Sequence, residues 1–240
     1  MLALSIQAPF AVFRTFTAGW YRPTATFLTP SAAYGLILNL AGVETRLCES
    51  EEGHPGTVSA SLMRTGLPHV KLALGLPASA EHPRVATVYQ QLHNYPVGSS
   101  GNERAKTTFG NKYNITPVRR ELLTNLHAVV LMDGNADLED SVRKGLRGET
   151  VAERYGLPFL GDNAFLPDRI DLIEELPATY WFEQVTADTT ELRHRTTRLT
   201  IWIDRADFSR TKSALYAPTE VASPDVPAAA WTLIAPQPSE

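Results

Sequence analysis

Alternating apolar residues at the start of the chain predict a short strand. Leu2, Leu4 and Ile6 alternate with polar neighbours, and this period of two is typical of a strand with one buried face. Pro9 has no backbone N–H to give to a sheet, so we expect the strand to end there.

A helix is predicted next. Thr29 is a candidate N-cap, and Pro30 suits the first helical position, where its missing N–H costs nothing. Apolar residues recur at helical spacing as far as Ala41, and Gly42 provides the stop. Gly35 lowers the helix propensity by ~1 kcal/mol, so we expect another backbone to approach it closely.

Three further strands are predicted in the middle of the chain, over residues 70–76, 85–92 and 117–132. On the last of them, the residues expected on one buried face are Leu122, Leu126, Ala128, Val130 and Met132. Residues 94–116 are rich in Gly, Ser, Asn and Thr and also carry basic and aromatic residues. We expect this segment to project from the sheet as a hairpin or flexible loop.

A second helix is expected to begin at Asp137 as its N-cap, to bury Leu138, Val142 and Leu146, and to end at Gly148. Later strands are predicted around 170–173, 180–185, 199–203 and 214–216. Beyond residue 218, proline and alanine dominate, and we expect a tail whose last residues are frayed.

This order of elements predicts an α+β fold of the ferredoxin-like (RRM-like) βαββαβ type, with a thumb-like hairpin insertion at about 94–116. The predicted organisation is one ferredoxin-like domain over 1–175. Residues 176–240 would form a small β-rich extension with the Pro/Ala-rich tail.

Composition places the chain among globular proteins. It has 240 residues, of which 43% are apolar and 20% charged. Its longest apolar run, residues 32–41, is half the length of a membrane span, and no secretory signal is visible. The single cysteine, Cys48, excludes an internal disulfide and fits a reducing compartment. We expect a cytoplasmic protein without a membrane partner.

Charge is unevenly distributed along the chain. The net charge of −4 argues against non-specific nucleic-acid binding by the whole surface. Residues 84–120, however, contain six basic residues against one acid, and residues 136–190 contain twelve acids against five bases. This asymmetry suits a polyanion on one side and a protein partner on the other, and it equally suits solvated charge clusters.

Residues 10–42 hold seven of the 21 aromatic residues, two arginines and no acid. Aromatic rings interleaved with guanidinium groups suit stacked bases and phosphates, and a helix N-terminus offers backbone donors to an anion. The alternative is an apolar loop that covers a sheet.

Little in the sequence points to catalysis or a cofactor. The six histidines are dispersed and there is no cysteine cluster, so no metal or other cofactor is expected. A metal-independent endoribonuclease would need only a base, an acid and a cation. Residues in or near the basic insertion that could supply these groups are His93, Tyr95, Lys106, Lys112, Tyr113 and His127. We favour a non-enzymatic protein and keep this ribonuclease as an alternative.

Residues 13–42, FRTFTAGWYRPTATFLTPSAAYGLILNLAG, resemble the N-terminal signature of the Cas-five family, a subunit of the type I CRISPR Cascade complex. This family belongs to the repeat-associated mysterious protein (RAMP) superfamily, and the resemblance is to its DevS-type branch. Further matches are TPVRRE at 116–121 and YGLPFLGDNAFL at 155–166.

The resemblance implies a ferredoxin-like body that caps one end of the complex and holds the 5′ handle of the CRISPR RNA under a projecting thumb. The implied partners are CRISPR RNA, the Cascade backbone and large subunits, and target DNA through the complex. One branch of the family cuts precursor CRISPR RNA with Tyr, Lys and His residues, but this chain lacks a Lys-His dipeptide near the expected position.

The implied RNA site draws on basic, aromatic and helix-start residues. The candidates are Arg14, Trp20, Tyr21, Arg22, Thr29, Ser31, Arg104, Lys106, Phe109, Lys112, Arg119 and Arg120. Two functions remain as alternatives, the ribonuclease above and a generic single-stranded RNA-binding module. The sequence leaves open whether such a complex serves defence or guided transposition.

Overall fold

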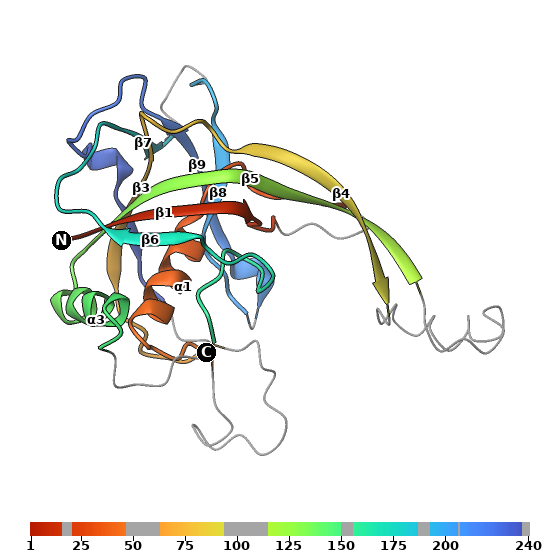
Figure 1. Cartoon of the computed structure of the whole chain (residues 1–240), viewed down its shortest axis with the longest axis horizontal. Coiled ribbons are helices and arrows are strands. Elements are labelled where there is room, and N and C mark those ends of the chain that lie inside the picture. The colour runs from red at the N-terminus through yellow and green to blue at the C-terminus, as the bar shows by residue number, and fades with distance from the viewer. Residues whose placement is uncertain are drawn as a thin grey trace, which may run out of the picture.

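The computed structural model describes residues 1–15, 21–46, 63–93, 115–149, 156–186, 193–205 and 207–236. Two α-helices and ten strands lie in these ranges (Figure 1). In chain order they are β1 (Leu2–Ala11), β2 (Tyr21–Arg22), α1 (Pro30–Leu40), β3 (Val70–Pro77), β4 (Arg84–His93), β5 (Ile115–Asp133), α3 (Ala136–Leu146), β6 (Arg169–Leu172), β7 (Thr179–Gln184), β8 (Thr197–Trp202), β9 (Lys212–Pro218) and β10 (Thr232–Ile234).

The strands form one large, mainly antiparallel sheet in the order β6-β1-β5-β3-β7-β9-β8. β10 is an additional partner of β3, and both β2 and β4 pair with β5. The protein is therefore a mixed α/β structure built on an antiparallel sheet. Strands from before and after residue 175 pair directly, since β7 bonds to β3 and then to β9.

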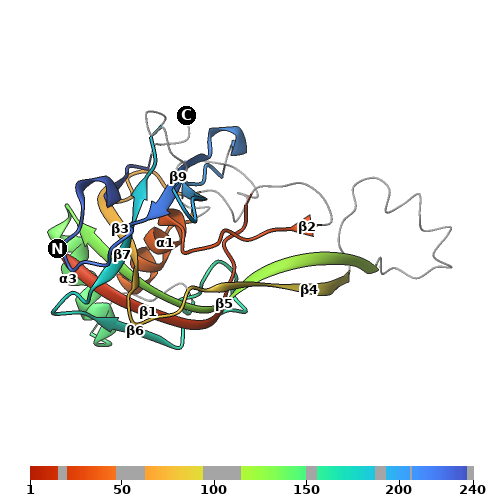
Figure 2. The same cartoon turned by 90° about the horizontal axis from the view of Figure 1, so that it is seen from above.

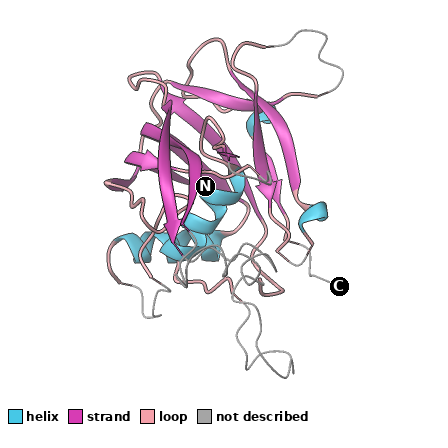
Figure 3. Ribbon diagram, turned by 90° about the vertical axis from the view of Figure 1, so that its right-hand side faces the viewer, coloured by secondary structure: helices cyan, strands magenta, loops and turns pink. Residues whose placement is uncertain are grey.

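Helix α1 lies in the main core, between strands on two sides (Figure 3). Thr29 caps it as predicted, with its side chain accepting from the Ala32 N–H. Its buried residues are Pro30, Ala33, Tyr34, Leu36, Ile37, Leu38 and Leu40. A helix that is apolar on most of its circumference must be covered on several sides, and here β3, β8, β10 and α3 all contact it.

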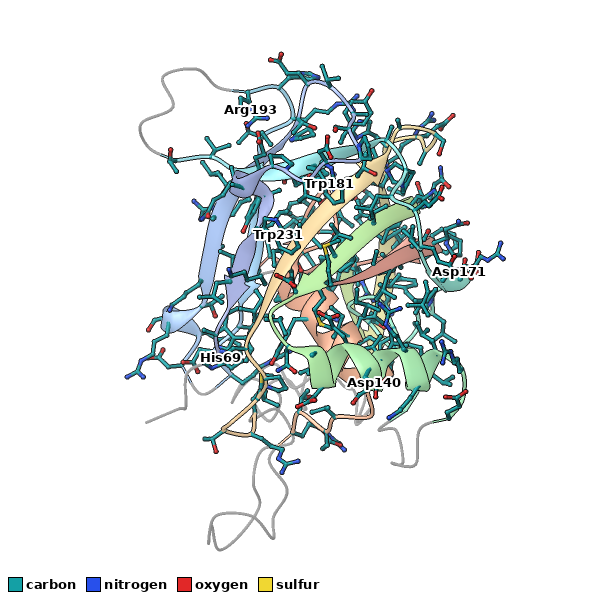
Figure 4. The ribbon with its side chains drawn as sticks, turned by 90° about the vertical axis from the view of Figure 1, so that its left-hand side faces the viewer. His69, Asp140, Asp171, Trp181, Arg193 and Trp231 are labelled. Atoms are coloured by element: carbon teal, nitrogen blue, oxygen red, sulfur yellow. The ribbon has the colours of Figure 1, made fainter. Side chains whose placement is uncertain are left out.

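The other face of the sheet carries a second, smaller core. Ala73 of β3, Val129 and Leu131 of β5 and Trp181 of β7 form it with Ala230, from the segment before β10. Figure 4 shows Trp181 and Trp231 beside β3, on the side where the C-terminal strands lie. The chain after residue 218 is thus part of the fold, whereas no regular element was predicted there.

Strand β5 is long enough to pair with β1 and β3 in the body of the protein and also with β4 beyond it. Its second half pairs with β1 and β3 in the body, and its first half pairs with β4 from Arg84↔Thr124 to His93↔Ile115. We call the β4–β5 pair the hairpin arm, and it projects away from the body in Figures 1 and 2. The predicted insertion at 94–116 is the continuation of this arm, and residues 94–114 lie outside the described ranges.

Asn125 marks the change from arm to body. It has a φ of 56°, in the left-handed region, where Asn is tolerated better than most residues. Successive strand residues normally alternate between faces, yet Leu123 and Leu126 both lie in the main core. The irregularity at Asn125 resets the alternation, so Leu123 takes the place on the core face that was predicted for Leu122.

Three further details differ from the sequence predictions. β1 continues through Pro9 to Ala11, opposite the irregular stretch of β5. The N-cap of α3 is Asn135, whose side chain accepts from Leu138 N–H, and not Asp137. No atom lies within 4 Å of a Cβ built on Gly35, so this glycine does not mark a close backbone approach.

Candidate nucleic-acid interface

Five of the predicted RNA-binding residues come together at the root of the hairpin arm. They are Arg14, Tyr21, Arg22, Arg119 and Arg120, from two parts of the sequence about 100 residues apart. Thr29 and Ser31 lie at the start of α1. The remaining candidates, Trp20, Arg104, Lys106, Phe109 and Lys112, lie outside the described residues.

Backbone pairing produces this gathering. Tyr21 and Arg22 of β2 pair in parallel with Arg119 and Arg120 of β5. Phe13, which precedes β2, lies beside Thr24 and Ala25, which follow it. Ala25 N–H donates to Phe13 O at 2.8 Å, and Phe13 N–H donates to Thr24 Oγ1 at 2.9 Å. These contacts hold β2 and the residues beside it at the edge of β5.

The register divides these side chains between two faces of the arm. Residues that are partners across neighbouring strands project to the same face. Tyr21 and Arg119 therefore share one face with Tyr89, the β4 partner of Arg119. Arg22 and Arg120 share the opposite face with Val88 of β4.

On the first face, Arg119 and Tyr21 are held against each other. The Arg119 guanidinium carbon lies 5.0 Å from the centre of the Tyr21 ring, a cation–π geometry. The Tyr21 hydroxyl donates to Glu121, and the other oxygen of this carboxylate accepts from Thr24 N–H at 3.2 Å. The hydrogen bond to Glu121 is the main cause that raises the pKa of Tyr21, so the phenol stays protonated and its ring position is fixed.

On the second face, Asp162 holds two of the predicted phosphate partners. Arg120 pairs with Asp162 at 2.5 Å and Arg14 pairs with the same oxygen at 3.4 Å. Arg120 also donates to Gln90 at 3.3 Å and lies 5.4 Å from the centre of the Phe165 ring. Its side chain is only 11% exposed, whereas that of Arg14 is 51% exposed. Arg120 therefore joins the arm to the body, and Arg14 keeps an open side.

The pKa of Asp162 reflects these contacts. Burial on its own would raise this pKa, but the hydrogen bonds from Ala164 N–H and Arg120 and the charges of Arg120 and Arg14 outweigh it. The pKa is therefore held below its ordinary value, and Asp162 is ionised at neutral pH. Sequence reasoning missed this carboxylate, although it lies inside the matched segment YGLPFLGDNAFL.

The loop that carries Asp162 is packed tightly against the end of β1. Val12 N–H donates to Leu160 O at 3.1 Å, and Leu160 N–H donates to Phe165 O at 2.8 Å. Gly161 has a φ of 80°, and a Cβ there would lie 1.6 Å from Val12 O. Only glycine fits this position, so the segment places Asp162 beside the two arginines.

At the start of α1, the Thr29 side chain is buried and hydrogen-bonded to its own helix. Thr29 is 3% exposed, and its hydroxyl accepts from Ala32 N–H at 3.3 Å and lies 3.2 Å from the Ser31 hydroxyl. The Thr29 side chain thus serves its own helix as a cap. That Thr29 and Ser31 touch RNA stays a prediction.

Arg205 is a basic residue that the sequence analysis did not select. It follows β8, and partial burial together with the positive charge of Arg14 lowers its pKa. Two guanidinium groups thus raise the positive potential near the arm, although 191 positions separate Arg14 from Arg205 in the chain. No local pattern marks this residue.

The described residues contain neither a cluster of metal ligands nor a helix that could span a membrane. Within the described ranges, no group of three or more His, Cys, Asp or Glu side chains has an arrangement that could hold a metal ion. Nor is any helix in this part of the chain long and apolar enough to cross a membrane.

Comparison with known proteins gives relatives among CRISPR-associated proteins. No family model matches the sequence. The CRISPR-associated protein Cas5 of Myxococcus xanthus (strain DK1622) is 25% identical over 244 residues, covering 95% of this chain and 98% of that protein. A chain of a solved CRISPR RNA-guided surveillance complex aligns with a TM-score of 0.54 at 15% identity, over 92% of this chain and 91% of its own length. A crystal structure of a Cas protein aligns with a TM-score of 0.46 at 13% identity, covering 92% of this chain and 93% of that one.

Two findings agree on this relationship. The identity with the curated relative extends over almost the whole of both proteins, and the fold is that of a solved Cas-complex chain. The chain is therefore similar, over almost its whole length, to a CRISPR-associated Cas5 protein.

Proposed function

We propose that this chain is a non-catalytic subunit of a Cascade-type CRISPR ribonucleoprotein, in which it binds and caps the 5′ handle of the CRISPR RNA for RNA-guided DNA targeting. The observation that carries the proposal is the root of the hairpin arm, where Arg14, Tyr21, Arg22 and Arg119 lie together. The Cas5 relative and the surveillance-complex neighbour support it.

The topology supports a ferredoxin-like body for this role. β1, α1, β3, β5, α3 and β6 follow one another in βαββαβ order, with the sheet order β6-β1-β5-β3 and antiparallel neighbours. β4 and the first half of β5 are then an insertion between the second and third strands of this body. In this proposal the arm and residues 94–114 act as the thumb over the RNA.

The chemistry at the root of the arm suits single-stranded RNA. Such RNA is bound through phosphate contacts and through bases that stack on aromatic rings or guanidinium planes. A net charge of −4 gives the whole surface little general attraction for RNA. Specific binding therefore has to come from a local group of arginines and aromatics.

One residue considered for the ribonuclease alternative lies on the sheet in contact with its neighbours. Burial lowers the pKa of His127, whose Nε2 lies 3.3 Å from Ser5 Oγ and 3.5 Å from Gln7 Nε2 on the sheet. His127, a residue considered for the ribonuclease, is thus partly packed into the sheet.

Copurification is the direct test of RNA binding. The full chain, expressed with a CRISPR array, should copurify with one discrete RNA species, and sequencing should give a constant 5′ end. An RNA population without a common 5′ sequence would point instead to a generic single-stranded RNA-binding module. The absence of RNA would overturn the proposal.

A cleavage assay tests the non-catalytic part. Purified protein mixed with precursor CRISPR RNA and a chelator should leave the RNA intact at neutral pH. Cutting at one site in the repeat that survives the chelator and is lost in Lys112→Ala or His127→Ala would establish the endoribonuclease alternative.

A further inference from the structure

We propose that Tyr89, together with Arg119 and Tyr21, forms a stacking platform for one unpaired nucleobase on the outer face of the hairpin arm. This inference rests on the proposed RNA-binding function and identifies the surface that would receive a base. Tyr89 is not part of any motif singled out in the sequence.

The three side chains form one row across three strands. Tyr89 is the β4 partner of Arg119, and Tyr21 is its β2 partner on the other side of β5. Neighbouring strands lie about 4.8 Å apart, so the two tyrosine backbones are about 10 Å apart with Arg119 between them. All three side chains project to the same face.

Tyr89 has the exposure that a stacking ring needs. It is 79% exposed, the largest fraction among the exposed aromatic side chains of the described residues. The ring contributes little to the core at this exposure, so burial does not account for an aromatic at this position.

Arg119 and Tyr21 form the prearranged half of the platform. Glu121 binds both the Tyr21 hydroxyl and Thr24 N–H, which fixes β2 and the Tyr21 ring against β5. Arg119 lies over that ring at 5.0 Å. A guanidinium stacked on a ring keeps its N–H groups directed outward in its own plane, where they can bind the phosphate next to a base stacked on Tyr89.

On the opposite face of the arm, the corresponding arginine is already bound by the protein. There Arg120 is 11% exposed and paired with Asp162, so its charge is already neutralised by the protein. The row of Tyr89, Arg119 and Tyr21 therefore presents aromatic rings and a cation to a ligand, whereas Arg120 on the opposite face joins the arm to the body.

The test is a titration of full-length protein with single-stranded RNA that carries 2-aminopurine at successive positions. Wild-type protein should quench the fluorescence at one position. Tyr89→Ala should remove that quenching and weaken binding about tenfold, the scale of one lost base–aromatic stack. Tyr89→Phe should bind as wild type does, because the ring is retained.

Two further variants test whether the Tyr89 ring stacks on a base. Tyr89→Leu retains apolar area without a π face, so undiminished binding by this variant would overturn stacking. Val85→Ala is the control, because Val85 is 43% exposed on the same strand and face but lies outside the row, and it should bind normally. If wild-type protein binds RNA and all Tyr89 variants match it, only the platform fails; if wild type binds no RNA, the proposed function fails as well. Loss of copurifying proteins with unchanged RNA binding in Tyr89→Ala would make this face a protein interface and overturn the platform.

Discussion

At the root of the hairpin arm, one carboxylate pairs with two arginines that come from distant parts of the chain. Asp162 reaches Arg120 at 2.5 Å and Arg14 at 3.4 Å, and both Asp162 and Arg120 are mostly buried. Removing one member of a buried ion pair leaves the other charged and without compensation. Asp162 is therefore the residue on which the attachment of the arm most depends.

We expect Asp162→Asn to lower the free energy of unfolding by about 2–3 kcal/mol, less than for a fully buried pair because some solvent reaches both groups. Urea unfolding measures this change. Arg14→Ala is the matched control, since it breaks only the longer, more exposed pair and should cost about 0.5 kcal/mol. Equal stability of Asp162→Asn and wild type would mean that this ion pair does not hold the arm.

The same carboxylate predicts a pH dependence. Because the folded pKa of Asp162 is below its ordinary value, the unfolded state takes up a proton first as the pH falls. The stability from Asp162 is fully present above about pH 5 and is lost progressively below about pH 4. The difference in unfolding free energy between wild type and Asp162→Asn should therefore narrow from pH 6 to pH 3, in urea titrations at each pH. A constant difference over this range would contradict the assigned ion pairs.

At the scale of elements, the loop before β6 and the arm depend on each other. The loop places Asp162 through its backbone contacts with Val12 and through the left-handed Gly161. The arm, in turn, carries Arg120 to this carboxylate on the first half of β5. A change in the loop backbone should therefore affect the arm.

Two glycines of this loop give a matched comparison. Gly156 and Gly161 both have a φ of 80°, but a Cβ on Gly156 meets no atom of the described residues within 4 Å, whereas one on Gly161 would lie 1.6 Å from Val12 O. Gly156→Ala should cost about 1 kcal/mol through its backbone conformation alone. Gly161→Ala should cost more than about 3 kcal/mol because the loop has to move away from β1. Thermal unfolding of the two variants measures the difference, and similar melting temperatures would show that the loop is not packed as described.

At the scale of the whole molecule, charge is distributed unevenly along the chain. Residues 84–120 carry six basic residues and one acid, and the acid-rich stretch 136–190 includes α3 and β6. Asp140 on α3 and Asp171 on β6 are labelled in Figure 4. RNA binding by this protein should therefore depend on where a charge lies more than on how many charges there are.

A pair of triple variants tests this. Replacing Lys106, Lys112 and Arg119 with Ala should weaken handle binding and lower the slope of log affinity against log salt by about 2, at roughly 0.7 per phosphate contact for single strands. Replacing Arg143, Lys144 and Arg147 of the α3 region removes the same net charge and should leave the slope nearly unchanged. Equal slopes for the two variants would place the RNA away from the arm.

Local patterns in the sequence predicted most of the helices and strands and five residues at the root of the arm. Period-two and helical spacing identified most of the strands and both helices, and Thr29 was found as a cap because capping involves only neighbouring residues. The resemblance in residues 13–42 and 116–121 selected Arg14, Tyr21, Arg22, Arg119 and Arg120, which the fold then brings to one place. These features could be predicted because each depends on a short stretch of chain.

The tertiary structure decided how those residues are used. Arg120 is bound by Asp162, and Arg119 is left on the face it shares with Tyr89, because strand register determines which side chains project together. The left-handed Asn125 changed which face of the sheet the following side chains take, which alternation alone could not predict. β10 and Arg205 were missed for the same reason: β10 pairs with β3, and the charge of Arg205 is affected by that of Arg14, and in each case the two are more than 150 positions apart in the sequence.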